Sequence, residues 1–270
     1  MFDLSRPMPD VFSVEVFSPS GDRHVDLANP RSPVILLDAG IAGLVGSPVV
    51  STASSIGAAG QVITGAVAQP IEGTLSCLVQ TLSIRDVSAV TAWFRGMWSN
   101  TAESTLIITH PRFGRWSLPV RLSGALPAPG GDPADGGDIV FDVPLVGDGG
   151  VWLSDAFSSQ HTENIVTVTN YGDVLVAPRI VWNGAGGEVK LPSGTTFTLP
   201  PVSQPRVLSL AWADGLKVTA MDGVLDREVW VKVRGKALAE QIPVGESGVF
   251  HLPDGASLEW RIGVYDPWKG

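Results

Sequence analysis

The chain has almost no cysteine and no long apolar run, and each absence excludes a class of protein. One cysteine, Cys77, occurs among 270 residues, so no disulfide can form within the chain and a zinc site built from thiolates is excluded. Cys77 lies in the apolar run Leu75–Val79, where we expect a buried strand thiol. No stretch approaches the roughly 18 apolar residues of a membrane span, and the N-terminus has no signal-peptide pattern. We therefore expect synthesis in a cytoplasm and no insertion into a membrane.

Positive charge is scarce, especially in the first half. Residues 1–158 hold 8 basic and 15 acidic residues with no lysine, residues 159–270 hold 10 and 12, and the whole chain carries a formal charge of −9. A nucleic-acid-binding face needs clustered Lys and Arg to displace counterions from phosphates. We therefore expect no sequence-specific binding of nucleic acid.

Signatures of catalysis and metal binding are also missing from the sequence. It contains no nucleophile elbow, no helical zinc-binding pair and no phosphate loop. Asp226 and Glu228 could form a glycosidase-like carboxylate pair, but their spacing only predicts that both lie on one strand face. The histidines lie apart, without a second ligand at metal-binding spacing; they are His24, His110, His161 and His251. We predict no catalytic residue, no cofactor and no metal, and expect that the protein is not an enzyme.

The composition favours short strands joined by many turns. Hydrophobic residues make up 44% of the chain and charged residues 17%, with 31 Gly and 21 Pro, which is typical of strands separated by turns. Alternation of apolar and polar residues predicts strands at Val11–Phe17, Ile165–Thr169 and Glu228–Val233. Turn signals are densest after residue 170, where successive hairpins are expected. The fold class is predicted to be mainly β.

One segment has helical periodicity. After Asp86, the apolar residues Val87, Val90, Phe94 and Met97 recur at helical spacing, which predicts a helix over 83–100 that Asp86 could cap. A single helix on a sheet makes the first half α+β, a β-sandwich-like domain with one helix, and leaves the second half all-β.

Two segments have an unusual composition, and a third marks the expected boundary between two domains. Residues 47–68 are rich in Gly, Ala, Ser and Val with few charges, which indicates an extended arm or long hairpin whose edges a neighbouring subunit could complete. Residues 126–138 are rich in Pro, Gly and Asp and are predicted to form a flexible loop. We place the domain boundary near Ser158, which gives domains 1–158 and 159–270.

Tryptophans are frequent in the second half, at 182, 212, 230 and 260. Trp182 and Trp230 have apolar neighbours and are expected in or beside the core. Trp212 precedes Ala-Asp-Gly and could lie near a hairpin tip, where an exposed indole can stack on a sugar ring. Trp212 is therefore a candidate carbohydrate contact, and a carbohydrate-binding β-sandwich module that contacts host cell-wall glycans remains an alternative for the whole protein.

The order of motifs in the second half is informative. The segments Thr167–Asp173, Ala177–Gly184 and Asp222–Leu225 place an Asn-x-Gly-Asp turn before a Pro-x-Ile strand and a later Asp-Gly turn. This order resembles the siphophage distal tail protein family. The first half is similar to that family in its order of elements: a Gly-rich opening, a strand pair near 72–83, a helix, a hairpin around Arg112–Arg115 and a closing strand before Trp152. The segments 47–68 and 126–138 do not map onto the family pattern.

The resemblance implies a structural protein of a phage virion, located at the tail tip. Its N-terminal domain would form a homo-oligomeric ring, usually hexameric, around the tail lumen, and its C-terminal domain would be a galectin-like β-sandwich. Implied partners are the tail tube protein, the baseplate hub or tail-associated lysin, and other minor tail proteins. DNA would pass through the lumen, where an acidic wall keeps it from adhering.

Overall fold

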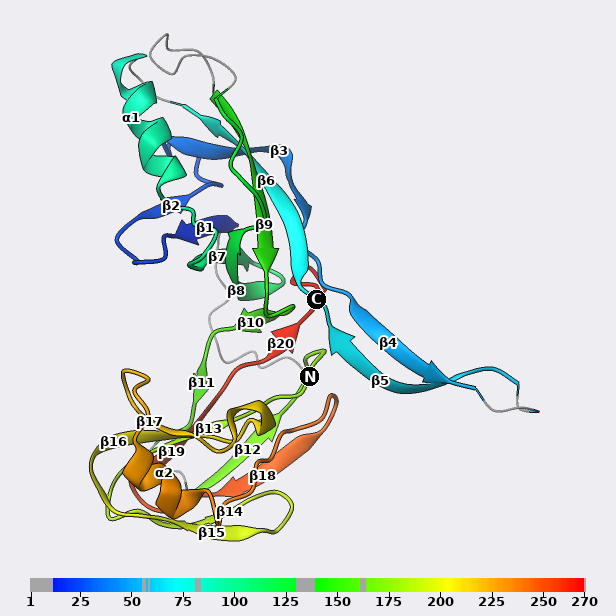
Figure 1. The fold of residues 1–270 in the computed structure, drawn as a ribbon, viewed down its shortest axis with the longest axis vertical. Helices are drawn as coiled ribbons and strands as arrows, with labels where there is room; N and C mark the ends of the chain where they lie inside the picture. The colour runs from blue at the N-terminus through cyan, green and yellow to red at the C-terminus, as the bar shows by residue number, and fades with distance from the viewer. Residues whose placement is uncertain are drawn as a thin grey trace. The chain divides into compact units, whose positions relative to one another are not determined.

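The chain folds into two compact units built mainly of antiparallel strands (Figure 1). The computed structural model describes residues 12–54, 57, 59–80, 84–129, 139–160 and 164–269. Unit 1 comprises Met1–Leu153 and Val264–Gly270, and unit 2 comprises Ser154–Gly263. The predicted mainly β class is confirmed. The two units differ from the expected ranges 1–158 and 159–270, because the chain leaves unit 1 before Ser158 and its last residues return to it.

Unit 1 is organised around one nine-stranded sheet. Seven strands follow the order β2-β1-β7-β8-β9-β6-β3, and β10 pairs with both β8 and β20. Their bounds are β1 (Ser13–Phe17), β2 (His24–Asp26), β3 (Val34–Gly43), β6 (Ile71–Val79), β7 (Ser104–His110), β8 (Gly114–Leu122), β9 (Ile139–Gly147), β10 (Trp152–Ser154) and β20 (Gly263–Val264). The predicted hairpin around Arg112–Arg115 is confirmed as the β7–β8 turn. Cys77 of β6 is fully buried, and burial raises the pKa of its thiol to about 12.

The predicted helix exists but is shorter than expected. Helix α1 spans Ile84–Arg95 and buries Val87 and Phe94; the Phe94 ring centroid lies 5.8 Å from that of Phe141 in β9. Near the end of the helix, the Arg23 guanidinium donates to the Trp93 carbonyl and lies beside Gly96, where a Cβ atom would displace it.

The predicted helix over 83–100 differs from α1 at its C-terminal end and in its cap. Met97 and Trp98 are buried beyond the end of α1, so helical periodicity continued into a turn that still faces the core. Asp86 lies in the first turn of α1 and not at its cap position, which corrects that expectation. Ser83 lies outside the described residues.

Unit 2 is a β-sandwich of two antiparallel sheets. One has the order β11-β19-β13-β16-β17 and the other β12-β18-β14-β15. In the four-stranded sheet, strands β12, β15 and β18 alternate buried and exposed residues, so this sheet turns one face inward. The bounds are β11 (Phe157–Ser158), β12 (Ile165–Thr169), β13 (Arg179–Gly184), β14 (Gly187–Lys190), β15 (Thr196–Leu199), β16 (Val202–Ser209), β17 (Val218–Ala220), β18 (Ser247–His251) and β19 (Ala256–Trp260).

The expectation that the second half is all-β was wrong at one place. The predicted strand Glu228–Val233 lies in helix α2 (Arg227–Val233). Asp226 is its N-cap and accepts a hydrogen bond from the Val229 N–H, while Val229 and Val233 are the buried residues of the helix. These two valines are four residues apart and so lie on one helical face. The apolar positions that suggested a strand therefore also fit a helix. Asp226 and Glu228 therefore do not share a strand face.

Candidate assembly interface

A two-stranded arm is the most exposed part of unit 1. Strands β4 (Pro48–Ala53) and β5 (Val62–Ala68) pair with each other and form a separate two-stranded sheet, which Figure 1 shows extending from the strands of unit 1. The register runs from Val49 opposite Val67 to Ala53 opposite Val62, with a shift after Ser51. The predicted long hairpin over 47–68 is confirmed over its described residues.

The arm exposes aliphatic side chains on both of its faces. Val62 is 70% exposed, Ile63 68%, Val67 62% and Val49 56%. No charged residue occurs between Asp38 and Glu72. An isolated two-stranded ribbon is at best marginally stable in water, and uncharged open edges invite pairing with another chain. The arm therefore has the physical properties of an element that another protein surface covers.

Burial and three hydrogen bonds hold the root of the arm. Leu44 is almost fully buried and has φ 58°, a left-handed conformation. Its N–H donates to the Glu72 carbonyl at 2.9 Å, and its carbonyl accepts from Trp152 Nε1 at 2.8 Å. Two residues on, the Gly46 N–H donates to the Tyr265 carbonyl at 2.8 Å. These bonds fix the direction in which the arm leaves the sheet.

Trp212, the candidate carbohydrate contact, lies on the surface of unit 2. It begins a 3-10 turn (Trp212–Asp214), and its side chain is 72% exposed. The turn is held by Asp214, which accepts from the Ser209 hydroxyl at 2.6 Å, and by Trp230, whose Nε1 donates to the Gly215 carbonyl at 3.2 Å. The indole is thus presented by an ordered turn. By contrast Trp182 is buried, as expected, and Trp230 is half-buried.

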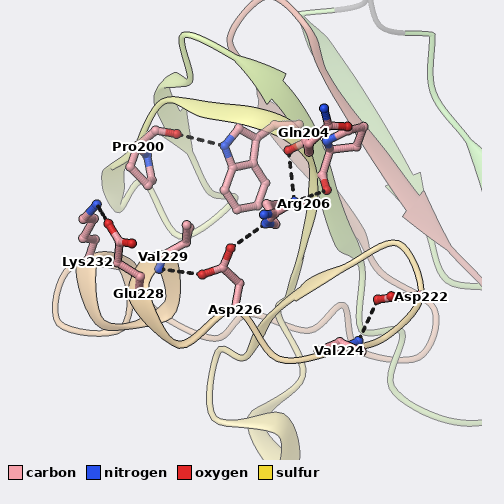
Figure 2. A network of polar contacts seen from close by, with 11 residues as sticks. Pro200, Gln204, Arg206, Asp222, Val224, Asp226, Glu228, Val229 and Lys232 are labelled. Carbon is pink, nitrogen blue, oxygen red and sulfur yellow. Dashed lines mark hydrogen bonds and ion pairs between the residues drawn. The ribbon is translucent and has the colours of Figure 1, made fainter.

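A polar network positions α2 against the sandwich. Figure 2 shows Asp226 between Arg206 of β16 and the first turn of α2. Arg206 Nε donates to Asp226 Oδ2 at 2.6 Å, and the Val229 N–H donates to Asp226 Oδ1 at 3.1 Å. These hydrogen bonds, the Arg206 bond foremost, hold the pKa of Asp226 below its usual value. Asp226 therefore acts as a helix cap and pairs with Arg206, whereas Glu228 pairs with Lys232 at 2.7 Å.

The histidines have structural neighbours where the structure describes them. His24 stacks on Phe17 with ring centroids 4.3 Å apart, His110 stacks on Phe113 at 4.5 Å, and His251 is exposed on β18. His161 lies outside the described residues. Within the described part of the chain, no group of three or more His, Cys, Asp or Glu side chains could hold a metal ion. No helix in that part is long and apolar enough to cross a membrane.

Comparison with known proteins gives a match in structure and none in sequence. No family model matches the chain, and no curated protein matches it. The Dit protein of phage SPP1, described as a paradigm of the hub adsorption apparatus in phages that infect Gram-positive bacteria, has a TM-score of 0.61 at 11% identity, over 94% of this chain and 99% of that one. A chain of the phage P2 baseplate in its activated conformation with Ca has a TM-score of 0.56 at 11% identity, over 93% and 98%. The same baseplate with Sr gives 0.55 at 10% identity. The chain therefore has the fold of these tail proteins along nearly its whole length.

Proposed function

We propose that the chain is a distal tail protein, a structural component of the tail tip of a long-tailed phage. In this proposal unit 1 forms a homo-oligomeric ring, with six subunits as the expected number, and unit 2 is a galectin-like outer domain. The ring joins the tail tube to the baseplate hub or tail-associated lysin and to other minor tail proteins. The protein works in the virion by assembly and docking and not by catalysis. The observation that carries the proposal is the match in fold to SPP1 Dit over both units.

The exposed arm supports self-assembly. A ring requires a heterologous interface, in which one surface of each subunit meets a different surface of the next. The arm can supply one of these surfaces, because it projects uncharged aliphatic side chains from a root that hydrogen bonds hold. Burying them against a neighbour removes apolar area from water and pairs their open strand edges.

Introducing charge into the arm is expected to prevent assembly. The double substitution Val62→Lys and Ile63→Lys places two charges at positions that the assembled protein would bury. Burying each apolar side chain stabilises the assembly by about 1.5–3 kcal/mol, so we expect the association constant to fall by about 100-fold or more without them. Light scattering after size exclusion and electron microscopy of the peak measure the effect. Val140→Lys is the matched control, since Val140 is an exposed valine on β9, outside the arm. Open-centred rings from the arm variant would contradict this role of the arm, and a compact wild-type monomer would contradict unaided ring formation.

A second candidate function, glycan binding by unit 2, rests on the exposure of Trp212. We expect any glycan-array signal of the protein to disappear in Trp212→Ala, because a stacked indole supplies much of the binding surface for a sugar ring. Met221→Ala is the control, since Met221 is a comparably exposed apolar residue of the same unit. A silent array for the wild-type protein, or equal signals from wild type and Trp212→Ala, would remove this candidate.

A further inference from the structure

Strand β12 (Ile165–Thr169) forms one edge of the four-stranded sheet in unit 2. The order β12-β18-β14-β15 gives it a single neighbour, β18, within the described part of the chain. In antiparallel pairs, alternate residues turn their backbone groups toward the partner strand. The bonds from the Leu252 N–H to the Asn164 carbonyl and from the Asn170 N–H to the Glu246 carbonyl show that even-numbered residues face β18. The N–H and C=O groups of Ile165, Thr167 and Thr169 therefore point away from the sheet.

This edge lacks the features with which proteins usually block strand pairing. The sequence Ile-Val-Thr-Val-Thr contains no charge, proline or glycine, and its register with β18 is unbroken. The other edges of the sandwich are less open. Strands β11 and β17 have two and three residues, and β15 has four residues followed directly by Pro200 and Pro201, which have no N–H to donate.

We propose that β12 pairs antiparallel with β12 of a second copy of this chain, about a twofold axis at Thr167. The outward-facing residues are spaced symmetrically about Thr167. Thr167 therefore meets Thr167 of the second copy, Ile165 meets Thr169 of the second copy, and Thr169 meets Ile165 of the second copy. Each of these three pairs can exchange two backbone hydrogen bonds. The pairing joins two four-stranded sheets into one continuous sheet and covers Ile165, which is 63% exposed.

A second copy suits this edge better than an unrelated chain, because the edge is complementary to itself. Thr–Thr and Thr–Ile neighbours are favourable cross-strand pairs, and the absence of charge on β12 means that no like charges face each other at the contact. A single strand pair buries less than the roughly 1,200 Å² of a standard interface, so the contact is weak between isolated molecules. It becomes effective where two assemblies face each other across several such twofold axes, since linked contacts reinforce one another; neighbouring subunits of one ring, which are related by the ring axis, cannot form it. The proposal is independent of the ring proposal.

A charge-reversal experiment tests the twofold pairing, because Thr167 faces its own counterpart. Thr167→Lys and Thr167→Glu each place like charges directly opposite one another, which destabilises the pair, whereas an equal mixture of the two variants places opposite charges there. Sedimentation velocity measures the dimer. The parent protein for this test is the full chain with the Val62→Lys and Ile63→Lys arm substitutions, so that assembly through the arm does not contribute to the measured mass. We expect the parent to dimerise with rising concentration, each single variant to lose dimer at least about tenfold, and the mixture to recover it.

Matched variants on the opposite edge provide the control. Thr198 is exposed on β15 of the same sheet, so Thr198→Lys should dimerise as the parent does. In a second measurement, Thr167→Cys should yield an oxidised dimer on a non-reducing gel, because directly opposed cysteines lie within disulfide reach, and Thr198→Cys should not. The native Cys77 is fully buried and does not interfere. A parent that stays monomeric, or a mixture that fails to dimerise while the single variants remain folded, would overturn the proposal and leave the edge to a strand from another protein.

Discussion

Asn170→Leu is expected to lower the free energy of unfolding by about 2–5 kcal/mol, because the Gly172 N–H and the Val174 carbonyl lose their partner at about 1–3 kcal/mol each. The Ile242 carbonyl loses one of its two bonds and keeps the one from the Val176 N–H. Asn170 is 0% exposed. Its Nδ2 donates to the carbonyls of Val174 and Ile242, both at 2.8 Å, and its Oδ1 accepts from the Gly172 N–H at 2.9 Å. Leucine has the same branched arrangement of heavy atoms but can make none of these bonds. Urea unfolding of the full chain, followed by tryptophan fluorescence, measures the loss.

Asn164→Leu is the matched control for this prediction. Asn164 is exposed and makes one side-chain hydrogen bond, from Nδ2 to Asp254 Oδ1 at 2.9 Å. Water can replace that bond, so the expected loss is below about 1 kcal/mol. Equal stabilities for the two leucine variants would mean that the Asn170 bonds do not hold the turn.

The same turn explains why the Asn-x-Gly-Asp motif is recognisable in the sequence. A Cβ atom on Gly172 would lie 2.4 Å from the Gly263 carbonyl oxygen and 2.7 Å from the Ile262 side chain, and the Asp173 N–H donates to that same Gly263 carbonyl. Asparagine and glycine are both required by local geometry at these positions. The motif through which the sequence resembles distal tail proteins therefore marks a buried fold determinant and not a binding site.

Several strands could be predicted from the sequence because their patterns are local. Strand β12 has the predicted bounds Ile165–Thr169, and the β7–β8 hairpin lies where Arg112–Arg115 predicted it. In each case alternation and turn residues agree with burial.

The errors arose where one pattern fits two structures. Val229, Val231 and Val233 alternate as in a strand, but Val229 and Val233 are also one helical turn apart, and Asp226 caps that helix. Capping by a residue that also pairs with Arg206, twenty positions earlier, is a tertiary interaction that period analysis does not contain. The end of α1 is similar, since buried Met97 and Trp98 continue the apolar pattern beyond Arg95, where the helix ends.

The candidate interface could be predicted only in part. The composition of residues 47–68 indicated an arm, because a segment so poor in charge and so rich in small residues has no core of its own to build. The open edge of β12 could not be predicted, since strand order within a sheet is set by long-range pairing and leaves no local signal. The exposure of Trp212 was suggested by its neighbouring Ala-Asp-Gly, and its role as a sugar contact stays a prediction.

Trp152→Ala is expected to lower the free energy of unfolding by about 3–5 kcal/mol, the usual cost of emptying a buried tryptophan site, and also to weaken assembly. Trp152 is 0% exposed, and its Nε1 holds the Leu44 carbonyl at the root of the arm. Losing this residue creates a cavity and releases the segment from which β4 begins. Denaturant unfolding measures the loss of stability, hydrogen exchange at the Leu44 and Gly46 amides measures the release of the arm root, and light scattering after size exclusion measures the loss of assembly.

Trp152→Phe separates the two contributions, because phenylalanine fills much of the cavity but cannot donate to Leu44. We expect it to cost about 1–3 kcal/mol, the price of one unpaired buried carbonyl, and to speed exchange at the arm root. The matched control is Trp116→Phe, which removes an equivalent bond from Nε1 to the Phe113 carbonyl, 2.7 Å long, at a half-exposed hairpin turn. Water reaches that carbonyl, so stability should change by less than about 1 kcal/mol. If Trp152→Phe leaves exchange at Gly46 unchanged, the root is held by the Glu72 and Tyr265 bonds alone, and the direction of the arm does not depend on Trp152.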